Sequence, residues 1–74
     1  MKEIKLKVLI VDDEIDICYL LSGMLRQKEL NTAYVNTLSE ATYVLRNDPP
    51  DIIFLDNHLP DGLGIEYIQY IKKI

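Results

Sequence analysis

The sequence predicts an α/β fold in which a parallel β-sheet carries helices on both faces. Two unbroken apolar runs, within residues 5–11 and 52–55, have the length of strands that are buried on both faces, and each run ends in acidic residues. Segments with the apolar spacing of helices follow these runs, which gives the order β-α-β-α-β-α. Units of this kind favour a parallel sheet with right-handed crossovers.

The first unit is predicted to contain a strand over residues 5–11 and a helix from Asp13 to about Lys28. An apolar stripe at positions i, i+3, i+4, i+7 and i+8 predicts the buried face of this helix. The stripe comprises Ile17, Leu20, Leu21, Met24 and Leu25. Asn31 is the candidate left-handed cap at the end of the helix.

The second unit is predicted to contain a short strand over residues 32–35 and a helix that runs to about Asn47. Thr37, followed three residues later by Glu40, has the form of a capping box, which marks a helix start. The helix is expected to end before the next two prolines, because a residue that precedes proline avoids helical geometry. The inward-facing residues are predicted to be Ala41, Val44 and Leu45.

The third unit is predicted to contain a strand over residues 52–55 and a final helix that starts near Gly64. Pro60 is expected to fix the loop between them, and Gly64 to allow a tight approach to the helix. The apolar stripe of the helix comprises Ile65, Ile68 and Ile71, with Tyr67 and Tyr70 beside it.

Length and composition exclude several classes of protein. The 74 residues allow one small domain, and a net charge of −4 argues against direct binding of nucleic acid. The single cysteine, Cys18, cannot form an internal disulfide. Neither a signal peptide nor an apolar run of the ~20 residues needed to span a membrane is visible. A cytoplasmic setting is therefore expected.

Three carboxylates are predicted to converge at one edge of the sheet. Asp12 and Asp13 follow the first strand and Asp56 follows the third, so these residues meet at the same edge if the two strands lie side by side and parallel. Carboxylates crowded in this way repel each other, and a hard divalent cation bound through oxygen relieves the repulsion. The simpler alternative is that Asp56 is a turn residue, with Asp12 and Asp13 as acidic residues at a helix start.

The motifs Val8-Leu9-Ile10-Val11-Asp12-Asp13-Glu14 and Ile52-Ile53-Phe54-Leu55-Asp56, followed by Leu59-Pro60-Asp61-Gly62-Leu63-Gly64, resemble the receiver domain of bacterial two-component response regulators. The resemblance implies a flavodoxin-like (CheY-like) sheet with strand order 2-1-3. It covers essentially the whole chain but only three of the family's five βα units. Residues 1–74 are therefore expected to be the N-terminal part of a receiver domain.

The resemblance also implies roles for the acidic residues. Asp56 would be the phosphoacceptor, a nucleophile that takes a phosphoryl group from a sensor histidine kinase or a phosphotransfer protein. Asp12, Asp13, Asp56 and the backbone carbonyl of His58 would bind Mg²⁺. The side chain of His58 is a solvent-facing loop residue in the simpler view, although its position would let it tune hydrolysis of the acyl phosphate. Nothing implies a classical enzyme.

Kinase docking is the role that the resemblance implies for the first helix. Three of its residues lie off the predicted apolar stripe and near the site, and are candidates for partner recognition. They are Ile15, Cys18 and Tyr19.

The family also uses a Ser or Thr and a Lys from its fourth and fifth strands, and no residue of this chain is expected to replace them. Lys72 and Lys73 are expected at the far end of the last helix. The third strand would form an exposed apolar edge, which predicts a homodimer or a larger assembly. The alternative function is accordingly a receiver-like module that has lost phosphotransfer and acts by dimerising or docking. A phosphohydrolase of the haloacid dehalogenase type is a weaker alternative, because it expects Asp where this chain has His58.

Overall fold

A three-stranded parallel sheet forms the centre of the molecule in the computed structural model, which describes residues 6–71 except for the side chains of residues 65 and 69–71. The strands are β1 (Lys7–Val11), β2 (Asn31–Val35) and β3 (Ile52–Leu55), and β1 lies between the other two. The predicted fold class and the strand order 2-1-3 are confirmed.

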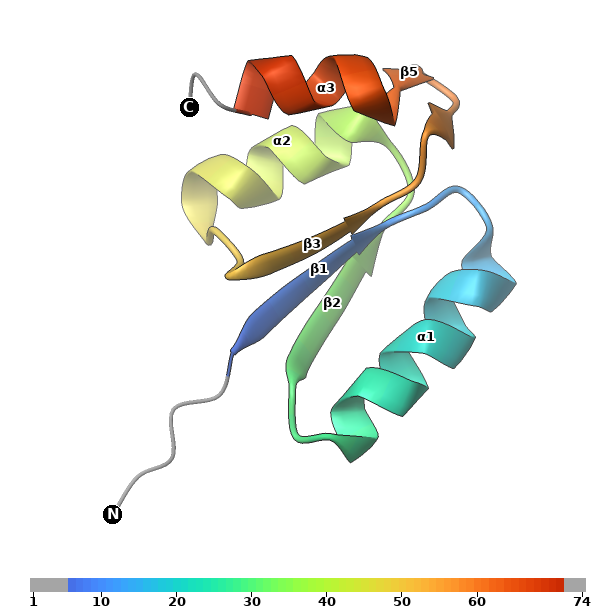
Figure 1. Ribbon diagram of the computed structural model, residues 1–74, viewed down its shortest axis with the longest axis vertical. Coiled ribbons are helices and arrows are strands. Elements are labelled where there is room, and N and C mark those ends of the chain that lie inside the picture. Colours follow the sequence, from blue (N-terminus) through green and yellow to red (C-terminus); the bar gives the residue numbers. More distant parts are fainter. Residues whose placement is uncertain (1–5, 72–74) are drawn as a thin grey trace.

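Within residues 6–71, three helices cover the two faces of the sheet. One face carries α1 (Ile15–Gln27), and the other carries α2 (Leu38–Asn47) and α3 (Gly64–Ile71) (Figure 1). Two very short strands, β4 (His58–Leu59) and β5 (Gly62–Leu63), form a hairpin between β3 and α3. This layered arrangement leaves the loops after β1, β2 and β3 at one edge of the sheet.

The strand register determines which residues meet at that edge. Val11, the last residue of β1, is paired with Val35 on one side and with Leu55 on the other. Two further backbone hydrogen bonds continue the ladder, from Asp12 N to Val35 O (3.1 Å) and from Asp56 N to Val11 O (2.9 Å). The first residues beyond the three strands therefore lie side by side.

The main core lies between the sheet and the pair α2 and α3. It is built from the buried residues Leu9, Val11, Leu38, Ala41, Leu59 and Tyr67. Val44 and Leu45 pack against this core, so the predicted inward face of α2 is confirmed. The Tyr67 hydroxyl lies 2.6 Å from the hydroxyl of Thr42, a hydrogen bond that joins α3 to α2.

The predicted apolar stripe of α3 was wrong at Ile68. Ile68 is 42% exposed, whereas Tyr67, which we expected beside the stripe, is buried. The aromatic ring offers more apolar area than Ile68, and its hydroxyl finds a partner on α2. The side chains of Ile65, Tyr70 and Ile71, as well as the whole of Lys5, Lys72 and Lys73, lie outside the described residues.

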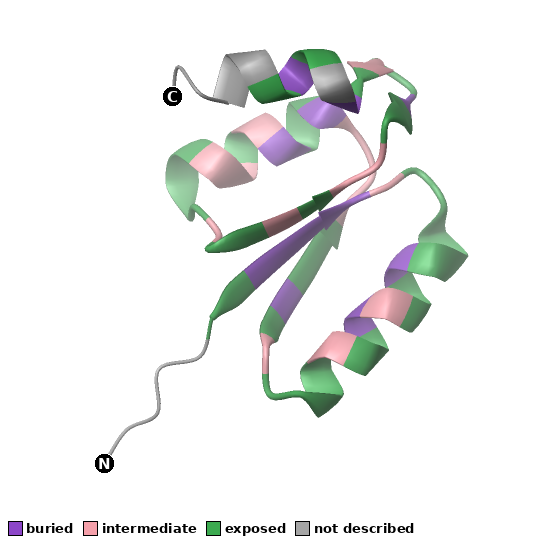
Figure 2. Ribbon diagram, in the orientation of Figure 1, coloured by how far each residue is buried: buried purple, intermediate pink, exposed green. Residues whose placement is uncertain are grey.

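The predicted buried face of α1 was wrong in part. The fully buried residues are Cys18 and Ser22, one helical turn apart, while Ile17, Leu20 and Met24 are 42%, 66% and 62% exposed. Figure 2 shows the buried segments of α1 on the side of the helix that faces the sheet. The small side chains of Cys18 and Ser22 let α1 approach β1 and β2 closely. The apolar stripe is wider than the surface that the described part of the sheet offers, so one flank of it remains at the surface.

The helix α1 ends at Gln27 with Lys28 as its C-cap, as predicted, but its start and the left-handed residue after it differ from the prediction. The helix begins at Ile15 with Glu14 as the N-cap residue, so Asp13 does not cap it. After Gln27 the chain turns at Glu29, which has φ of 63°, and Asn31 already belongs to β2. Glu29, and not Asn31, therefore occupies the left-handed position that ends the helix.

The start and end of α2 agree with the prediction. Thr37 is the N-cap residue, and its hydroxyl accepts a hydrogen bond from Glu40 N at 3.1 Å. The Glu40 carboxylate accepts a hydrogen bond from the backbone amide of Asn36, just before the helix, at 3.1 Å. The helix ends at Asn47, before the two prolines.

Candidate functional site

Three carboxylates form a cluster at the edge where the strands end. One oxygen from each of Asp12, Asp13 and Asp56 lies within 4.8 Å of the other two. Asp12 and Asp56 are half-buried, and Asp13 is exposed. The predicted convergence of these residues is confirmed; their roles in binding and phosphotransfer stay predictions.

The backbone of Asp12 is fixed from two directions. Its carbonyl accepts a hydrogen bond from Asn36 Nδ2 at 2.9 Å and one from Cys18 Sγ at 3.3 Å. Its carboxylate accepts from Glu14 N at 3.0 Å, which turns the chain from β1 into α1. The Asp12 backbone is therefore held by α1 and by the loop after β2, and its side chain is held by the amide of Glu14 just before α1.

The chain after Asp56 forms a tight loop closed by Gly64. Gly64 N donates to Asn57 O at 2.8 Å, and a Cβ atom at residue 64 would lie far inside contact distance of the Asp56 carbonyl oxygen. Only glycine allows this approach, so the predicted role of Gly64 is confirmed. Within the loop, His58 pairs with Leu63, and Pro60 lies in the turn of the hairpin.

His58 itself is exposed and lies two residues beyond Asp56, in β4. This places it on the loop that follows Asp56. A metal role for its backbone carbonyl and a tuning role for its side chain remain predictions.

The donor set fits a hard divalent cation. Mg²⁺ is bound through oxygen, commonly by one or two carboxylates with waters and phosphate oxygens completing the shell. The cluster offers three carboxylates, and the three negative charges favour a cation there. Asp12, Asp13 and Asp56 are the residues that would hold it.

Cys18 does not belong to a surface for partner recognition. Its side chain is fully buried under the acidic edge, and burial, followed by the nearby Asp12, raises the pKa of its thiol above the ordinary 9.0. The thiol therefore keeps its proton and can donate to the Asp12 carbonyl. Ile15 and Tyr19, by contrast, are 60% and 73% exposed and remain accessible to a partner.

Sequence reasoning missed two residues that hold the site together, Asn36 and Asp61. Asn36 follows β2 just as Asp12 and Asp56 follow their strands, so the same rule about strand ends could have indicated it. Asp61 accepts hydrogen bonds from Leu38 N at 2.8 Å and from Ser39 N at 3.0 Å. The Leu38 amide is the main reason why the pKa of Asp61 lies below its ordinary value of 3.8.

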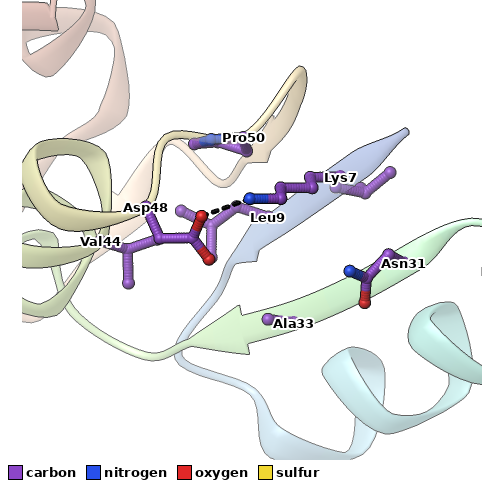
Figure 3. A pocket seen from close by; sticks show the side chains of 8 residues that line it. Lys7, Leu9, Asn31, Ala33, Val44, Asp48 and Pro50 are labelled. Carbon is purple, nitrogen blue, oxygen red and sulfur yellow. Dashed lines mark hydrogen bonds and ion pairs between the residues drawn. The ribbon is translucent and has the colours of Figure 1, made fainter. Parts of the chain in front are cut away.

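A second group of charges lies at the opposite edge of the sheet, where the strands begin. The Lys7 ammonium is paired with Asp48 beside a small pocket of about 80 Å³ (Figure 3). Lys7 N also donates to the Asp51 carboxylate at 2.8 Å. Lys7 therefore lies at the edge opposite the acidic cluster.

Comparison with known proteins identifies the class to which this fold and site belong. Residues 8–74 match the response regulator receiver domain family. The chain therefore belongs to the receiver domains of two-component response regulators. Domains of this family interact with histidine kinases or phosphotransfer proteins and generally bind Mg²⁺ in an acidic pocket.

Individual relatives agree with this assignment. The chain is 42% identical over 67 residues to the response regulator protein PilR of Pseudomonas aeruginosa, covering 90% of this chain and 15% of that protein. It is 31% identical over 67 residues to the phosphate regulon transcriptional regulatory protein PhoB of Escherichia coli, covering 90% of this chain and 29% of that protein. The chain thus spans less than a third of each of these relatives.

Solved receiver domains have the same fold. The non-phosphorylated HemR receiver domain from Leptospira biflexa superposes with a TM-score of 0.85 at 32% identity, over 93% of this chain and 56% of that one. A CheY-like receiver domain from Methylobacillus flagellatus gives a TM-score of 0.92 at 21% identity, over 96% of this chain and 60% of that one, which supports the fold alone. Among the described residues, no helix is long and apolar enough to cross a membrane.

Proposed function

We propose that this chain is a phosphoacceptor and that Asp56 takes a phosphoryl group from a histidine kinase. The observation that carries the proposal is the cluster of Asp12, Asp13 and Asp56 at the carboxyl edge of the sheet, in a chain that belongs to the receiver family. A strand-end carboxylate of this kind is a nucleophile that proteins use to form acyl phosphates.

The transfer needs one new bond and one broken bond. An oxygen of the Asp56 carboxylate attacks phosphorus, and the P–N bond to the kinase's histidine breaks. The imidazole leaves with the electron pair and takes up a proton, and Asp56 becomes a mixed anhydride with the phosphoryl group. The backbone hydrogen bond from Asp56 N to Val11 O holds the nucleophile in place during this step.

Mg²⁺ would be held by Asp12, Asp13 and Asp56, with the backbone carbonyl of His58 as a further ligand. When bound, the ion offsets the negative charge of the carboxylates and of the incoming phosphoryl group. This assignment is supported by the spacing of the three carboxylates, each of which has an oxygen within 4.8 Å of an oxygen of the other two.

With the described residues alone, the reaction is expected to be slow. Among the described residues, Lys7 lies at the opposite edge of the sheet, and Lys28 follows the end of α1 that points away from the acidic cluster (Figure 1). Neither lysine can pair with a phosphoryl group on Asp56. A missing positive charge of this kind typically costs orders of magnitude in rate.

Intact mass after incubation with acetyl phosphate and Mg²⁺ tests this proposal. A phosphate adduct should form slowly on the unmodified protein and be absent from Asp56→Asn. Asp16→Asn, which changes an exposed carboxylate in the first turn of α1, is the matched control and should keep the adduct. An adduct that persists in Asp56→Asn, or no adduct in folded protein, would contradict the proposal.

A second candidate function is an interaction module that works by self-association. In the part of the chain that the structure describes, β3 pairs with β1 on one side and with no strand on the other. Ile52 and Phe54 of β3 are 38% and 42% exposed beside this edge. An apolar edge strand favours pairing with another chain, so we propose a homodimer through β3.

Sedimentation over a range of concentrations tests the homodimer. The unmodified protein should associate, and Phe54→Lys should shift it toward the monomer, because a charged side chain near an edge strand opposes pairing. Ala33→Lys on β2 is a control at another exposed strand position. A monomer at high concentration would remove the self-association proposal and leave phosphotransfer untouched.

Three further assignments complete the proposal. The chain acts as a phosphoacceptor and not as a classical enzyme, and His58 in place of a second aspartate argues against a phosphohydrolase. Its partner is a histidine kinase or a phosphotransfer protein, with the exposed Ile15 and Tyr19 near the site as candidate contacts. The setting is the cytoplasm, as for response regulators in general.

A further inference from the structure

The N-terminus of α2 contacts the loops that carry the acidic cluster, although none of the cluster residues lies on it. The preceding residue Asn36 reaches the loop after β1, and the first amides of α2 reach the loop after β3. These two loops carry Asp12 and Asp56. The start of α2 is therefore a common point of attachment for both halves of the site.

Asn36 provides the connection to the loop after β1. Its side-chain amide donates to the Asp12 carbonyl at 2.9 Å, across 24 residues of sequence. Its own backbone amide donates to the Glu40 carboxylate at 3.1 Å, inside the capping box of α2. The Asp12 backbone is thus linked through Asn36 to the helix cap.

Asp61 provides the connection to the loop after β3. It lies in the turn of the β4–β5 hairpin, and its carboxylate accepts from Leu38 N (2.8 Å), Ser39 N (3.0 Å) and Ser39 Oγ (3.1 Å). A carboxylate that accepts from the first amides of a helix makes strong, directional hydrogen bonds. The hairpin that contains His58 is therefore fixed to the same helix end.

We propose that Asn36 and Asp61 are positioning residues that set the geometry of the Mg²⁺ and phosphoryl site through the N-terminus of α2. The two connections act in series: Asp12 is joined to Asn36, Asn36 to α2, α2 to Asp61, and Asp61 to the loop beyond Asp56. Breaking either connection uncouples the two loops, so breaking both adds little. This proposal rests on the proposed function, because it concerns the same site.

Mg²⁺ affinity, measured by isothermal titration with MgCl₂ alone, tests the proposal with no phosphodonor present. Outer contacts that orient metal ligands typically change affinity ~10–100-fold, so Asn36→Ala and Asp61→Ala should each weaken binding about tenfold. Because the two connections act in series, the Mg²⁺ affinity of the double variant should be within about twofold of the affinity of whichever single variant binds Mg²⁺ more weakly. If the double variant instead loses Mg²⁺ affinity by the product of the two single fold-changes, the proposal is overturned.

Two further variants separate positioning from charge and from stability. Asp61→Asn removes the same charge as Asp61→Ala but keeps an oxygen that can accept from Leu38 N, so it should bind Mg²⁺ several-fold more tightly than Asp61→Ala. Asn47→Ala removes a hydrogen bond to Tyr43 O (2.8 Å) at the other end of α2 and should leave Mg²⁺ affinity unchanged. Equal affinities for Asp61→Asn and Asp61→Ala would overturn the proposal.

The outcomes also separate this proposal from the proposed function. If the unmodified protein binds no Mg²⁺, both fail. If it binds Mg²⁺ and the Asn36 and Asp61 variants bind equally well, only the positioning role fails. Asp61 lies at an exposed turn, so its variants carry the test even if Asn36→Ala does not fold.

Discussion

The two edges of the sheet use charge in opposite ways. At the edge where the strands begin, Lys7 pairs with Asp48 and its backbone amide donates to Asp51. At the edge where the strands end, the carboxylates of Asp12, Asp13 and Asp56 lie together, and no ion pair is found among the described residues there.

The paired charges at one edge and the clustered carboxylates at the other are expected to have different roles. Charges that find partners within the protein contribute to stability but have little left to offer a ligand. Carboxylates that repel each other reduce stability until a cation binds between them. We therefore expect changes at the amino edge to alter stability alone, and changes at the carboxyl edge to alter both stability and Mg²⁺ binding.

The largest effect is expected for Gly64→Ala at the carboxyl edge. The added Cβ would collide with the Asp56 carbonyl oxygen and lie 3.1 Å from Asn57 Cα, so the loop must shift. We expect a loss of about 2–3 kcal/mol in the free energy of unfolding, measured with urea, together with weaker Mg²⁺ binding. Gly23→Ala is the matched control: it meets nothing within 4 Å in the middle of α1 and should stabilise by ~0.5–1 kcal/mol. Equal effects of the two substitutions would contradict the steric account.

A smaller effect is expected for Asp13→Asn. Removing one of three clustered charges relieves repulsion, so in the absence of divalent cations the variant should be more stable by about 0.5–1 kcal/mol. The same variant should gain less stability than the unmodified protein when Mg²⁺ is added. Urea unfolding with EDTA and with MgCl₂ measures both quantities, and a variant destabilised in EDTA would count against a strained acidic cluster.

A gain in stability without any change at the site is expected for Glu29→Gly. Glu29 has φ of 63° at the end of α1, on the side of the molecule where the strands begin. Glycine adopts this conformation without the steric cost that Glu incurs, and we expect stabilisation of about 0.5–1 kcal/mol. Mg²⁺ affinity should stay the same. A change in affinity would show that the two edges are not independent.

The smallest effect is expected for the Lys7–Asp48 pair, because both side chains are largely in water. The hydrogen bond and charge of Asp48 raise the pKa of Lys7 above its ordinary 10.5. The pair therefore stabilises fully below about pH 10.5, and this contribution is lost as the pH rises through the raised pKa. Urea midpoints of the unmodified protein and of Lys7→Met should converge at high pH. A difference that persists well above the raised pKa would show that the charge of Lys7 is not its source.

The sequence was sufficient for the features that depend on strand ends. Apolar runs located β1 and β3, and the strand order implied by the family resemblance made them neighbours, so Asp12, Asp13 and Asp56 were expected at one edge. Thr37 and Glu40 form the predicted capping box because that motif is local and needs no information from elsewhere in the chain.

Features that depend on distant contacts were not predictable. Periodicity found the apolar stripe of α1 but could not show that Cys18 and Ser22, and not Leu20 and Met24, face the sheet. The sequence could not show that Glu29, and not Asn31, has the left-handed conformation after α1, because this depends on where β2 begins its pairing with β1. The Asp61 contact joins residues 23 positions apart and has no local signature.

The most direct test of the central claim is the thermal midpoint measured with and without MgCl₂ for matched substitutions at the two edges. The account predicts that Mg²⁺ raises the midpoint of the unmodified protein and of Asp48→Asn by similar amounts, and raises that of Asp56→Asn much less. Equal shifts for Asp48→Asn and Asp56→Asn would contradict it, because Mg²⁺ would then bind without the carboxylate that we assign as the phosphoacceptor.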